Sequence, residues 1–173
     1  MSKIFRISHL LVTTLLSLTF PHPVEATPRV TSGTILEINS PVSTTSTTEL
    51  TVIVNGILNK TGDICLRVYN SEVGFLVNSS SEVKSGCTKI TGSSVKTVFS
   101  GLKPGNYAVA VMDDQNGDRK LNKDFFGIPT EGFGISRDPI VSMRTGMPKF
   151  RRASFKMTQN TTIDITMKYS LDP

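Results

Sequence analysis

Short runs of β-branched or alternating apolar residues, each closed by Gly, Asn, Ser or Pro, recur from position 49 onward. Runs bounded in this way are typical of strands, and no window shows a sustained apolar repeat of helical period. We interpret seven runs as strands, at residues 50–54, 64–69, 89–91, 95–99, 107–112, 149–157 and 161–169. The sequence therefore predicts an all-β fold: an antiparallel β-sandwich, immunoglobulin-like or transthyretin-like, with six to eight short strands in a single domain over residues 49–170.

The run at 107–112 is the strongest strand signal. It follows Pro104-Gly105, which favours a turn because proline fixes φ and glycine accepts a positive φ. Side chains alternate between the two faces of a strand. One face of this strand should therefore carry Tyr107, Val109 and Val111, and the other Ala108, Ala110 and Met112. The small residues on the second face allow another segment to pack closely against it.

The N-terminus has the pattern of a secretory signal peptide over residues 1–26. Lys3 and Arg6 precede an apolar stretch at 10–20, and small residues stand at −3 and −1 before a cleavage point after Ala26. The stretch is shorter than the roughly 20 residues of a membrane span, although an uncleaved anchor or a core helix is the alternative. We expect an exported protein, periplasmic, secreted or at the cell surface, with no transmembrane segment in the mature chain. Residues 27–48 are Ser/Thr-rich and predict a flexible lead-in, with a potential edge strand at 34–38.

The residues that remain after cleavage restrict the chemistry. His9 and His22 both lie in the signal segment, and the chain has no Trp. A mature chain without histidine cannot use a Ser–His–Asp or Cys–His arrangement, or a His-ligated metal.

Cys65 and Cys87 are the only two cysteines. An exported protein is free to form disulfides, so the pair predicts a structural bridge. Two free thiols, or a catalytic thiol, are the alternatives. A catalytic thiol would need a neighbouring base or cationic environment, and no histidine is at hand.

An acidic loop follows the strand at 107–112. Asp114, Asn116 and Asp118 occupy positions 1, 3 and 5 of a calcium-loop pattern, in which alternate oxygen-bearing side chains converge on one hard cation. We predict a calcium site over residues 114–124, with Ca²⁺ as a structural ion. Its expected ligands are Asp114, Asn116, Asp118, the carbonyl of Lys120, Asn122 and Asp124.

Two residues depart from that pattern. Arg119 stands where the sharp turn normally has glycine, and Phe125 stands where a bidentate glutamate is usual. One alternative is a solvated turn whose Asp and Asn side chains cap their own backbone. Another is a pair of catalytic carboxylates within residues 113–131, as in glycoside hydrolysis.

The segment 125–136 alternates aromatic residues with Gly and Pro, which suggests a long ordered loop across one end of the sandwich. Phe125, Phe126, Glu131 and Phe133 are candidate ligand-facing residues. The alternative is that the three phenylalanines close the core.

Basic residues gather after this loop, at Arg137, Arg144, Lys149, Arg151, Arg152 and Lys156. Such a group is usually a solvated face, but it can also attract an anionic surface polymer or a membrane surface. Nucleic acid is not an expected partner, because the protein is predicted to be exported and lacks interleaved aromatic stacking positions.

Several segments together resemble one bacterial family. They are residues 50–56, 64–75, 99–114, 116–122 and the run Phe-Gly-Ile-Pro-Thr-Glu-Gly-Phe-Gly at 126–134. Over residues 48–169 the chain is similar to the exported family called domain of unknown function 2141, and Cys65 with Ser85-Gly86-Cys87 resembles its cyanobacterial members. In that family the loop commonly reads Asp-x-Asn-x-Asn/Asp-Gly-Lys-Leu-Asp, so Arg119 and Asn122 are departures from it. The resemblance implies an exported β-sandwich and no particular activity.

Together these features predict a non-enzymatic, exported β-sandwich module of the cell envelope, with a binding or structural role. The alternative is a small glycan-directed hydrolase that uses the carboxylates of residues 113–131.

Overall fold

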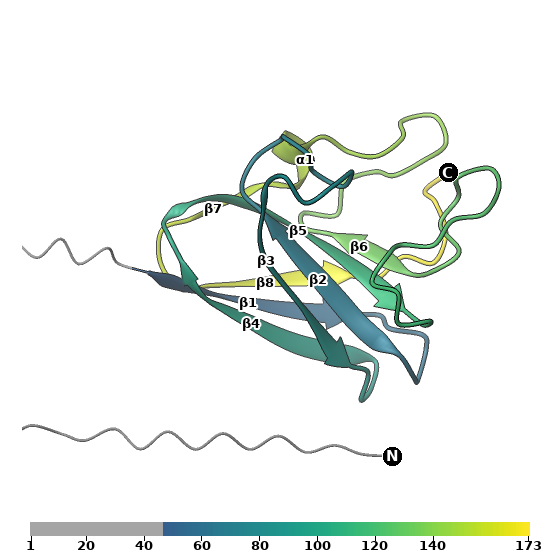
Figure 1. The fold of residues 1–173 in the computed structure, drawn as a ribbon, viewed down its shortest axis with the longest axis horizontal. Coiled ribbons are helices and arrows are strands. Elements are labelled where there is room, and N and C mark those ends of the chain that lie inside the picture. The colour runs from purple at the N-terminus through teal and green to yellow at the C-terminus, as the bar shows by residue number, and fades with distance from the viewer. Residues whose placement is uncertain (1–46) are drawn as a thin grey trace, which may run out of the picture. The chain divides into compact units, whose positions relative to one another are not determined.

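The computed structural model describes residues 47–173, which form two β-sheets packed face to face (Figure 1). The smaller sheet has the strand order β4 (Ser94–Leu102), β1 (Thr48–Asn55), β8 (Thr161–Thr166). The larger sheet has the order β3 (Glu82–Lys89), β2 (Asp63–Tyr69), β5 (Gly105–Asp114), β6 (Phe133–Ile135). Strand β7 (Phe155–Met157) pairs with the first residues of β5, and a short helix α1 (Phe150–Ala153) precedes it. The predicted β-sandwich is confirmed.

All pairings between these strands are antiparallel except one. Strand β8 runs parallel to β1, from Thr161 opposite Leu50 to Thr166 opposite Asn55. The chain leaves β7 in the larger sheet and crosses to the smaller one beside the start of β1, so β8 must run in the same direction as β1. A bridge between Phe133 and Lys168 then links the two sheets along this edge, with Lys168 N donating to the Phe133 carbonyl at 2.7 Å.

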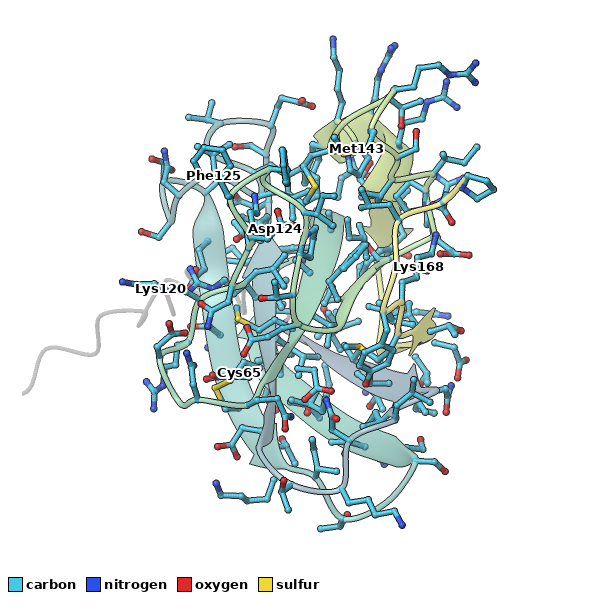
Figure 2. All side chains as sticks on the ribbon, turned by 90° about the vertical axis from the view of Figure 1, so that its right-hand side faces the viewer. Cys65, Lys120, Asp124, Phe125, Met143 and Lys168 are labelled. Carbon is cyan, nitrogen blue, oxygen red and sulfur yellow. A yellow bond between two sulfur atoms is a disulfide. The ribbon has the colours of Figure 1, made fainter. Side chains whose placement is uncertain are left out.

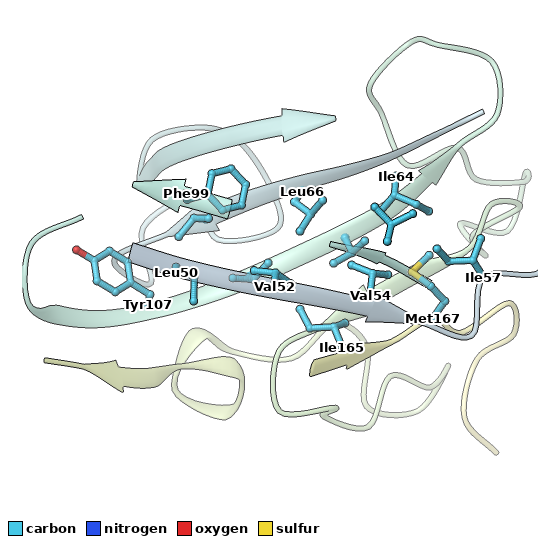
Figure 3. Packing of buried hydrophobic residues seen from close by; sticks show 14 of the residues in the cluster. Leu50, Val52, Val54, Ile57, Ile64, Leu66, Phe99, Tyr107, Ile165 and Met167 are labelled. Atoms are coloured by element: carbon cyan, nitrogen blue, oxygen red, sulfur yellow. The ribbon is translucent and has the colours of Figure 1, made fainter. Parts of the chain in front are cut away.

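The main core lies between the two sheets (Figure 3). Strand β1 presents every second residue to it, and Leu50, Val52 and Val54 are fully buried. Full burial of one aliphatic side chain contributes about 1.5–3 kcal/mol, so this layer accounts for much of the stability. Strand β5 alternates as predicted: its core-facing side chains are Tyr107, Val109 and Val111.

A second apolar cluster covers part of the outer face of the larger sheet. Ala108 of β5 and Ala153 of α1 are both fully buried in it. Phe75 packs edge-on against Tyr69 and Phe150, with ring centroids 5.2 and 5.6 Å apart. The small side chain of Ala108 therefore lies in a cluster to which α1 and the loop after β2 both contribute.

Three segments differ from the sequence prediction. Residues 149–157 do not form one strand, because the Ser154 N–H closes a helical turn onto the Phe150 carbonyl at 2.8 Å before β7 begins. Strand β3 begins at Glu82, well before the predicted run at 89–91; it is a sheet edge with mostly polar, exposed residues and so has no apolar alternation. Strand β6 has three residues and lies inside the predicted long loop.

The predicted signal peptide at 1–26, most of the lead-in at 27–48 and the potential edge strand at 34–38 lie outside the described residues. Residues 47–173 contain no helix with the length and apolar character needed to cross a membrane.

The predicted disulfide is confirmed. Cys65 of β2 and Cys87 of β3 stand directly opposite each other in the antiparallel register and are joined through their sulfur atoms. The bridge attaches the edge strand β3 to the buried strand β2 across a sequence separation of 22 residues.

Replacing both cysteines by alanine should lower the free energy of unfolding by about 3 kcal/mol, because the closed loop no longer restricts the unfolded chain. Urea denaturation with and without reductant measures this. The double variant serves as its own control, since reductant should leave its midpoint unchanged. Two titratable thiols in the denatured, unreduced protein would contradict the bridge.

Candidate functional site

The end of β5 places two carboxylates next to each other, on opposite faces of the sheet. Asp113 lies on the core side and is fully buried. Its Oδ2 accepts hydrogen bonds from Asn59 Nδ2 at 2.8 Å and from the Tyr169 hydroxyl at 2.7 Å, and its Oδ1 accepts one from the Gln115 amide. All three donors are neutral, and they come from segments after β1, β5 and β8. The carboxylate is therefore satisfied by the fold itself.

Tyr169 is the counterpart of Asp113. Its hydroxyl donates to Asp113 and accepts the N–H of Leu58 at 3.0 Å. Burial, together with the hydrogen bond to Asp113 and its negative charge, raises the pKa of Tyr169 to about 12, against the opposing effect of the Leu58 N–H. The phenol therefore remains a hydrogen-bond donor throughout the neutral range.

Asp114 faces the other side, towards the acidic loop, and is 2 % exposed. Its Oδ1 accepts the N–H of Gly117 at 2.8 Å and its Oδ2 the N–H of Arg119 at 3.0 Å. The Sγ of Cys65 lies 3.7 Å from Oδ2, a contact without a proton because that sulfur belongs to the disulfide. Asp114 thus organises the loop that follows it.

The predicted ligands in the first half of the loop come together on one tight turn. Asn116 Oδ1 accepts the N–H of Asp118 at 3.1 Å, and Asp118 Oδ1 accepts the N–H of Lys120 at 2.8 Å. This is the self-capping pattern that the sequence offered as an alternative to calcium. Within residues 47–173, no group of three or more His, Cys, Asp or Glu side chains is arranged to hold a metal ion. The calcium site remains a prediction.

Arg119 adopts a backbone conformation normally reserved for glycine, with φ of 58°. It occupies the loop position where a calcium loop has glycine, so the sharp turn forms without one. A non-glycine residue in this region costs about 1–2 kcal/mol, and contacts must offset that cost. The Arg119 N–H donates to Asp114, and its carbonyl accepts Nη2 of Arg67 at 2.8 Å.

The second half of the predicted site is a separate turn. Asp124 Oδ1 accepts the N–H groups of Phe126 and Ile128, both at 2.9 Å, which closes the turn 124–128. Asn122 acts through its backbone: its carbonyl accepts the N–H of Thr130 at 2.9 Å. Its own N–H donates to Glu131.

Glu131 connects the two ends of the acidic loop. Its two carboxylate oxygens accept the N–H of Gln115 at 3.1 Å and the N–H of Asn122 at 3.0 Å. The prediction of a ligand-facing Glu131 is untested, but both of its oxygens already bind the backbone. The loop is therefore held at its start, middle and end by carboxylates.

The three aromatic residues of the following segment do not share one environment. Phe133 is buried in β6 within the second apolar cluster, as the core interpretation expects. Phe125 and Phe126 are 96 % and 76 % exposed at the tip of the turn, so the core interpretation is wrong for them. Their rings contact each other edge-on at 5.6 Å, and Figure 2 shows Phe125 beside Asp124 at the edge of the molecule. Their role as ligand-facing residues remains a prediction.

Four of the six clustered basic residues line one groove. It has a volume of about 800 Å³, and its cationic lining residues are Arg137, Lys149, Arg151 and Arg152. Arg137 is held in place by donating to the Ser154 carbonyl at 3.0 Å, at the end of α1. Arg144 and Lys156 are exposed but do not line the groove.

The one acid that lines the groove, Asp138, forms an ion pair with Lys168. Lys168 forms ion pairs with Asp138 and Asp172, both at 2.9 Å. Burial disfavours the charged form of Lys168, but the hydrogen bonds and charges of the two aspartates outweigh it and raise its pKa. The pKa of Asp172 is lowered, first by the hydrogen bond from the Val141 N–H and second by the hydrogen bond from Lys168. The sequence did not reveal this clasp, because Asp138 lies 30 positions before Lys168, although Asp172 follows Lys168 by only four.

Residues 52–164 match the model of a family described as "Uncharacterized protein conserved in bacteria (DUF2141)". The chain belongs to this family. The match runs from within β1 to within β8 and so includes both sheets and the acidic loop. Among the curated proteins and the solved structures compared with it, none matches.

In this DUF2141 protein, the glycine-rich run at 126–134 has a structural purpose. A Cβ on Gly132 would stand 2.5 Å from the Tyr169 ring, and a Cβ on Gly134 would stand 2.7 Å from Ile165. Glycine at both positions lets β6 pass closely against the C-terminal segment. The Gly132 carbonyl also accepts the Asp113 N–H at 2.8 Å. The run therefore builds the carboxylate cluster at this end of the sandwich.

Replacing Tyr169 by phenylalanine should lower the free energy of unfolding at pH 7 by about 1–3 kcal/mol, because it removes a donor from a buried carboxylate. Urea denaturation measures the loss. Tyr107→Phe is the matched control: that hydroxyl donates to the Lys103 carbonyl, so only about 0.5–1.5 kcal/mol should be lost.

The pH dependence should also differ. Burial raises the pKa of Tyr169 in the folded protein to about 12, above the ordinary tyrosine value of 10.0. The stability that depends on the neutral phenol is therefore complete below pH 10 and is lost as the pH rises towards 12. The Tyr169→Phe variant has no phenol to ionise, so its stability should not fall for this reason over the same pH range. Equal stability of the two proteins at pH 7 would contradict the role assigned to the hydroxyl.

Proposed function

We propose that the protein is an exported, non-enzymatic binding module of the cell envelope that holds an anionic polymer in its basic groove. The observation that carries this proposal is the charge of the groove. Four cationic side chains line it, and its one acid, Asp138, is paired with Lys168. Such a surface attracts anions and concentrates them locally.

The types of cation fit a polymer with carboxylate, sulfate or phosphate groups. Three of the four are arginines, whose planar guanidinium presents paired donors to an oxyanion. Arg151 and Arg152 are adjacent on α1, and Arg137 is anchored beside them through Ser154. Several cationic side chains along one groove suit a repeating anion better than a single small ion.

Export is supported by the features of residues 1–26 and by the disulfide. A signal peptide directs the chain out of the cytoplasm, and structural disulfides persist mainly in oxidising compartments. The basic groove would then face anionic polymers of the cell envelope rather than nucleic acid.

A non-enzymatic role is supported by the state of the carboxylates. Asp113, Asp114 and Glu131 each accept at least two hydrogen bonds from the protein's own amide or hydroxyl groups. A general acid or base must instead reach a proton on the substrate. The alternative of a glycan-directed hydrolase is therefore less favoured.

We further propose that Ca²⁺ stiffens the acidic loop through Asp114, Asn116, Asp118, the carbonyl of Lys120, Asn122 and Asp124. Support comes from the alternate oxygen-bearing side chains on one turn and from the glycine-like backbone of Arg119. The carboxylates would exchange their hydrogen bonds to the backbone for metal contacts.

The calcium proposal predicts that calcium raises the melting temperature of the protein and that chelator reverses the rise. At about ten times its Kd, calcium adds roughly 1.4 kcal/mol to the stability. Asp118→Asn should reduce the effect, because it removes a ligand charge but keeps an oxygen that caps Lys120. Asp164→Asn, on β8, is the matched control. A melting temperature that responds to neither millimolar calcium nor chelator would overturn this proposal.

The polymer proposal predicts that the double variant Arg151→Gln, Arg152→Gln binds dextran sulfate roughly 2- to 30-fold more weakly at low salt, if each exposed charge contributes about 0.2–1 kcal/mol. Binding should fall with added salt, and neutral dextran should not bind. The control double variant Lys84→Gln, Lys96→Gln removes the same amount of charge from strands β3 and β4 and should have little effect on dextran sulfate binding.

Equal weakening by the two double variants would show only a nonspecific charge effect and contradict the groove. Turnover on a glycan panel that disappears in Asp114→Asn and Asp118→Asn would instead overturn the non-enzymatic assignment.

A further inference from the structure

A pocket of about 220 Å³ opens on the outer face of the larger sheet. Its floor is formed by Tyr69 of β2, Ala110 and Met112 of β5, and the three residues of β6. Its walls come from residues 76–78, from Lys120, Leu121 and Lys123, and from Met147. Apart from Met147, this pocket shares no lining residue with the basic groove.

The pocket exists because of one small side chain. Ala110 stands between Arg67 on one neighbouring strand and Ile135 on the other, in register with both. A methyl group there leaves the sheet surface lower than its surroundings, and the loop after β2 and the acidic loop rise on either side. The space is thus a property of the sheet and not of side-chain rotamers alone.

One wall is held in a strained conformation. Leu76 has φ of 60°, in the left-handed region that leucine rarely adopts. Its side chain packs against the second apolar cluster, which offsets the cost. Backbone strain of this kind is concentrated at ligand-binding sites, where the surrounding structure maintains it.

The lining is apolar inside and exposes apolar side chains at its mouth. Leu76 and Leu121 are partly buried against the second cluster, whereas Val77 is 85 % exposed and Met147 is 40 % exposed. Methionine adapts its shape to different apolar ligands. Such a lining favours an apolar ligand body.

The rim is cationic and carries no acid. Lys120 and Lys123 both line the pocket, and within residues 47–173 neither forms an ion pair. Arg67 also lines it, but its guanidinium is engaged by Glu82 at 3.2 Å and by the Arg119 carbonyl at 2.8 Å. Figure 2 shows Lys120 on the same side of the molecule as Cys65 and Asp124. The two lysines therefore supply an uncompensated positive charge beside an apolar space.

We propose that this pocket binds a small amphipathic carboxylate, with its apolar body on the floor at Ala110 and its carboxylate at Lys120 and Lys123. The volume equals roughly seven water volumes of about 30 Å³, which suits a ligand of about ten non-hydrogen atoms or fewer. A monovalent carboxylate loses less hydration at an apolar mouth than a divalent phosphate does. A hydrophilic polymer does not fill such a space, so this site is independent of the proposed polymer groove.

Octanoate and 1-octanol are the probes, because they share an alkyl chain and differ in charge. In ¹⁵N-resolved NMR titrations of the oxidised protein, octanoate should shift the amides of Ala110, Leu121 and Ile135. A ligand of this size should bind with a Kd of about 1 mM. 1-Octanol should bind at the same place but several-fold more weakly.

Variants separate the two halves of the site. Lys120→Gln with Lys123→Gln should weaken octanoate roughly 5-fold or more, at about 0.5 kcal/mol or more per charge, and leave octanol unchanged. The carbonyl of Lys120 is retained. Lys84→Gln with Lys96→Gln, with the same loss of charge, should alter neither ligand. Ala110→Leu should abolish the binding of both, because it fills the floor.

Met147→Asp provides a second test on an exposed loop position, where folding is not at risk. It should weaken octanoate more than octanol, because the new carboxylate repels the carboxylate of octanoate, whereas the loss of the thioether contact affects both ligands. The proposal is overturned if millimolar octanoate causes no shifts, or if the shifts lie instead at Arg137 and Lys149. It is also overturned if octanol binds as tightly as octanoate, or if a folded Ala110→Leu variant binds both like the wild type.

Discussion

The buried carboxylate of Asp113 is the interaction on which this end of the molecule depends. A carboxylate without water must have hydrogen-bond donors. Here they come from Asn59, Gln115 and Tyr169, which follow three different strands. The hydrogen bonds to this one carboxylate therefore hold three segments of the chain in place. Gly132, immediately before β6, then lets the chain approach the Tyr169 ring, and Glu131, one residue earlier, closes the acidic loop. The acidic loop starts from this cluster at Gln115 and returns to it at Glu131 and Gly132.

Strand β5 gives the sandwich two different faces. Its large residues complete the core, whereas its small residues face outward, where Ala108 lies in the cluster that includes Ala153 of α1 and Ala110 forms the floor of a pocket. This alternation could be predicted from sequence, because period two is a local property of a strand. The segments that cover the outer face could not be predicted. They come from loops near residues 76, 121 and 147, whose only shared feature is their position in space.

The contrast between a local sequence pattern and a position set only by the fold also explains why some elements were predicted and others were not. The strands predicted correctly, such as the one at 50–54, carry an apolar pattern of their own. Strand β3 lacks one because it is an edge, and β6 is three residues long and forms only through its pairing with β5 and its bridge to Lys168 after β8. In the candidate site, the spacing of Asp114, Asn116 and Asp118 correctly predicted residues that act together on one turn. It could not reveal that Asp124 closes a different turn, since that depends on where the chain reverses.

Arg119 connects the acidic loop to the pocket. Arg119 stands where a calcium loop normally has glycine, and its backbone takes the conformation that glycine would adopt there. Its carbonyl then holds Arg67, whose second partner is Glu82 of β3. The disulfide fixes β3 to β2 beside that pair. The Arg119 carbonyl therefore helps to position Arg67, one of the cations that line the pocket. The acidic loop also contributes Lys120, Leu121 and Lys123 to that lining, so the loop and the pocket share part of the chain.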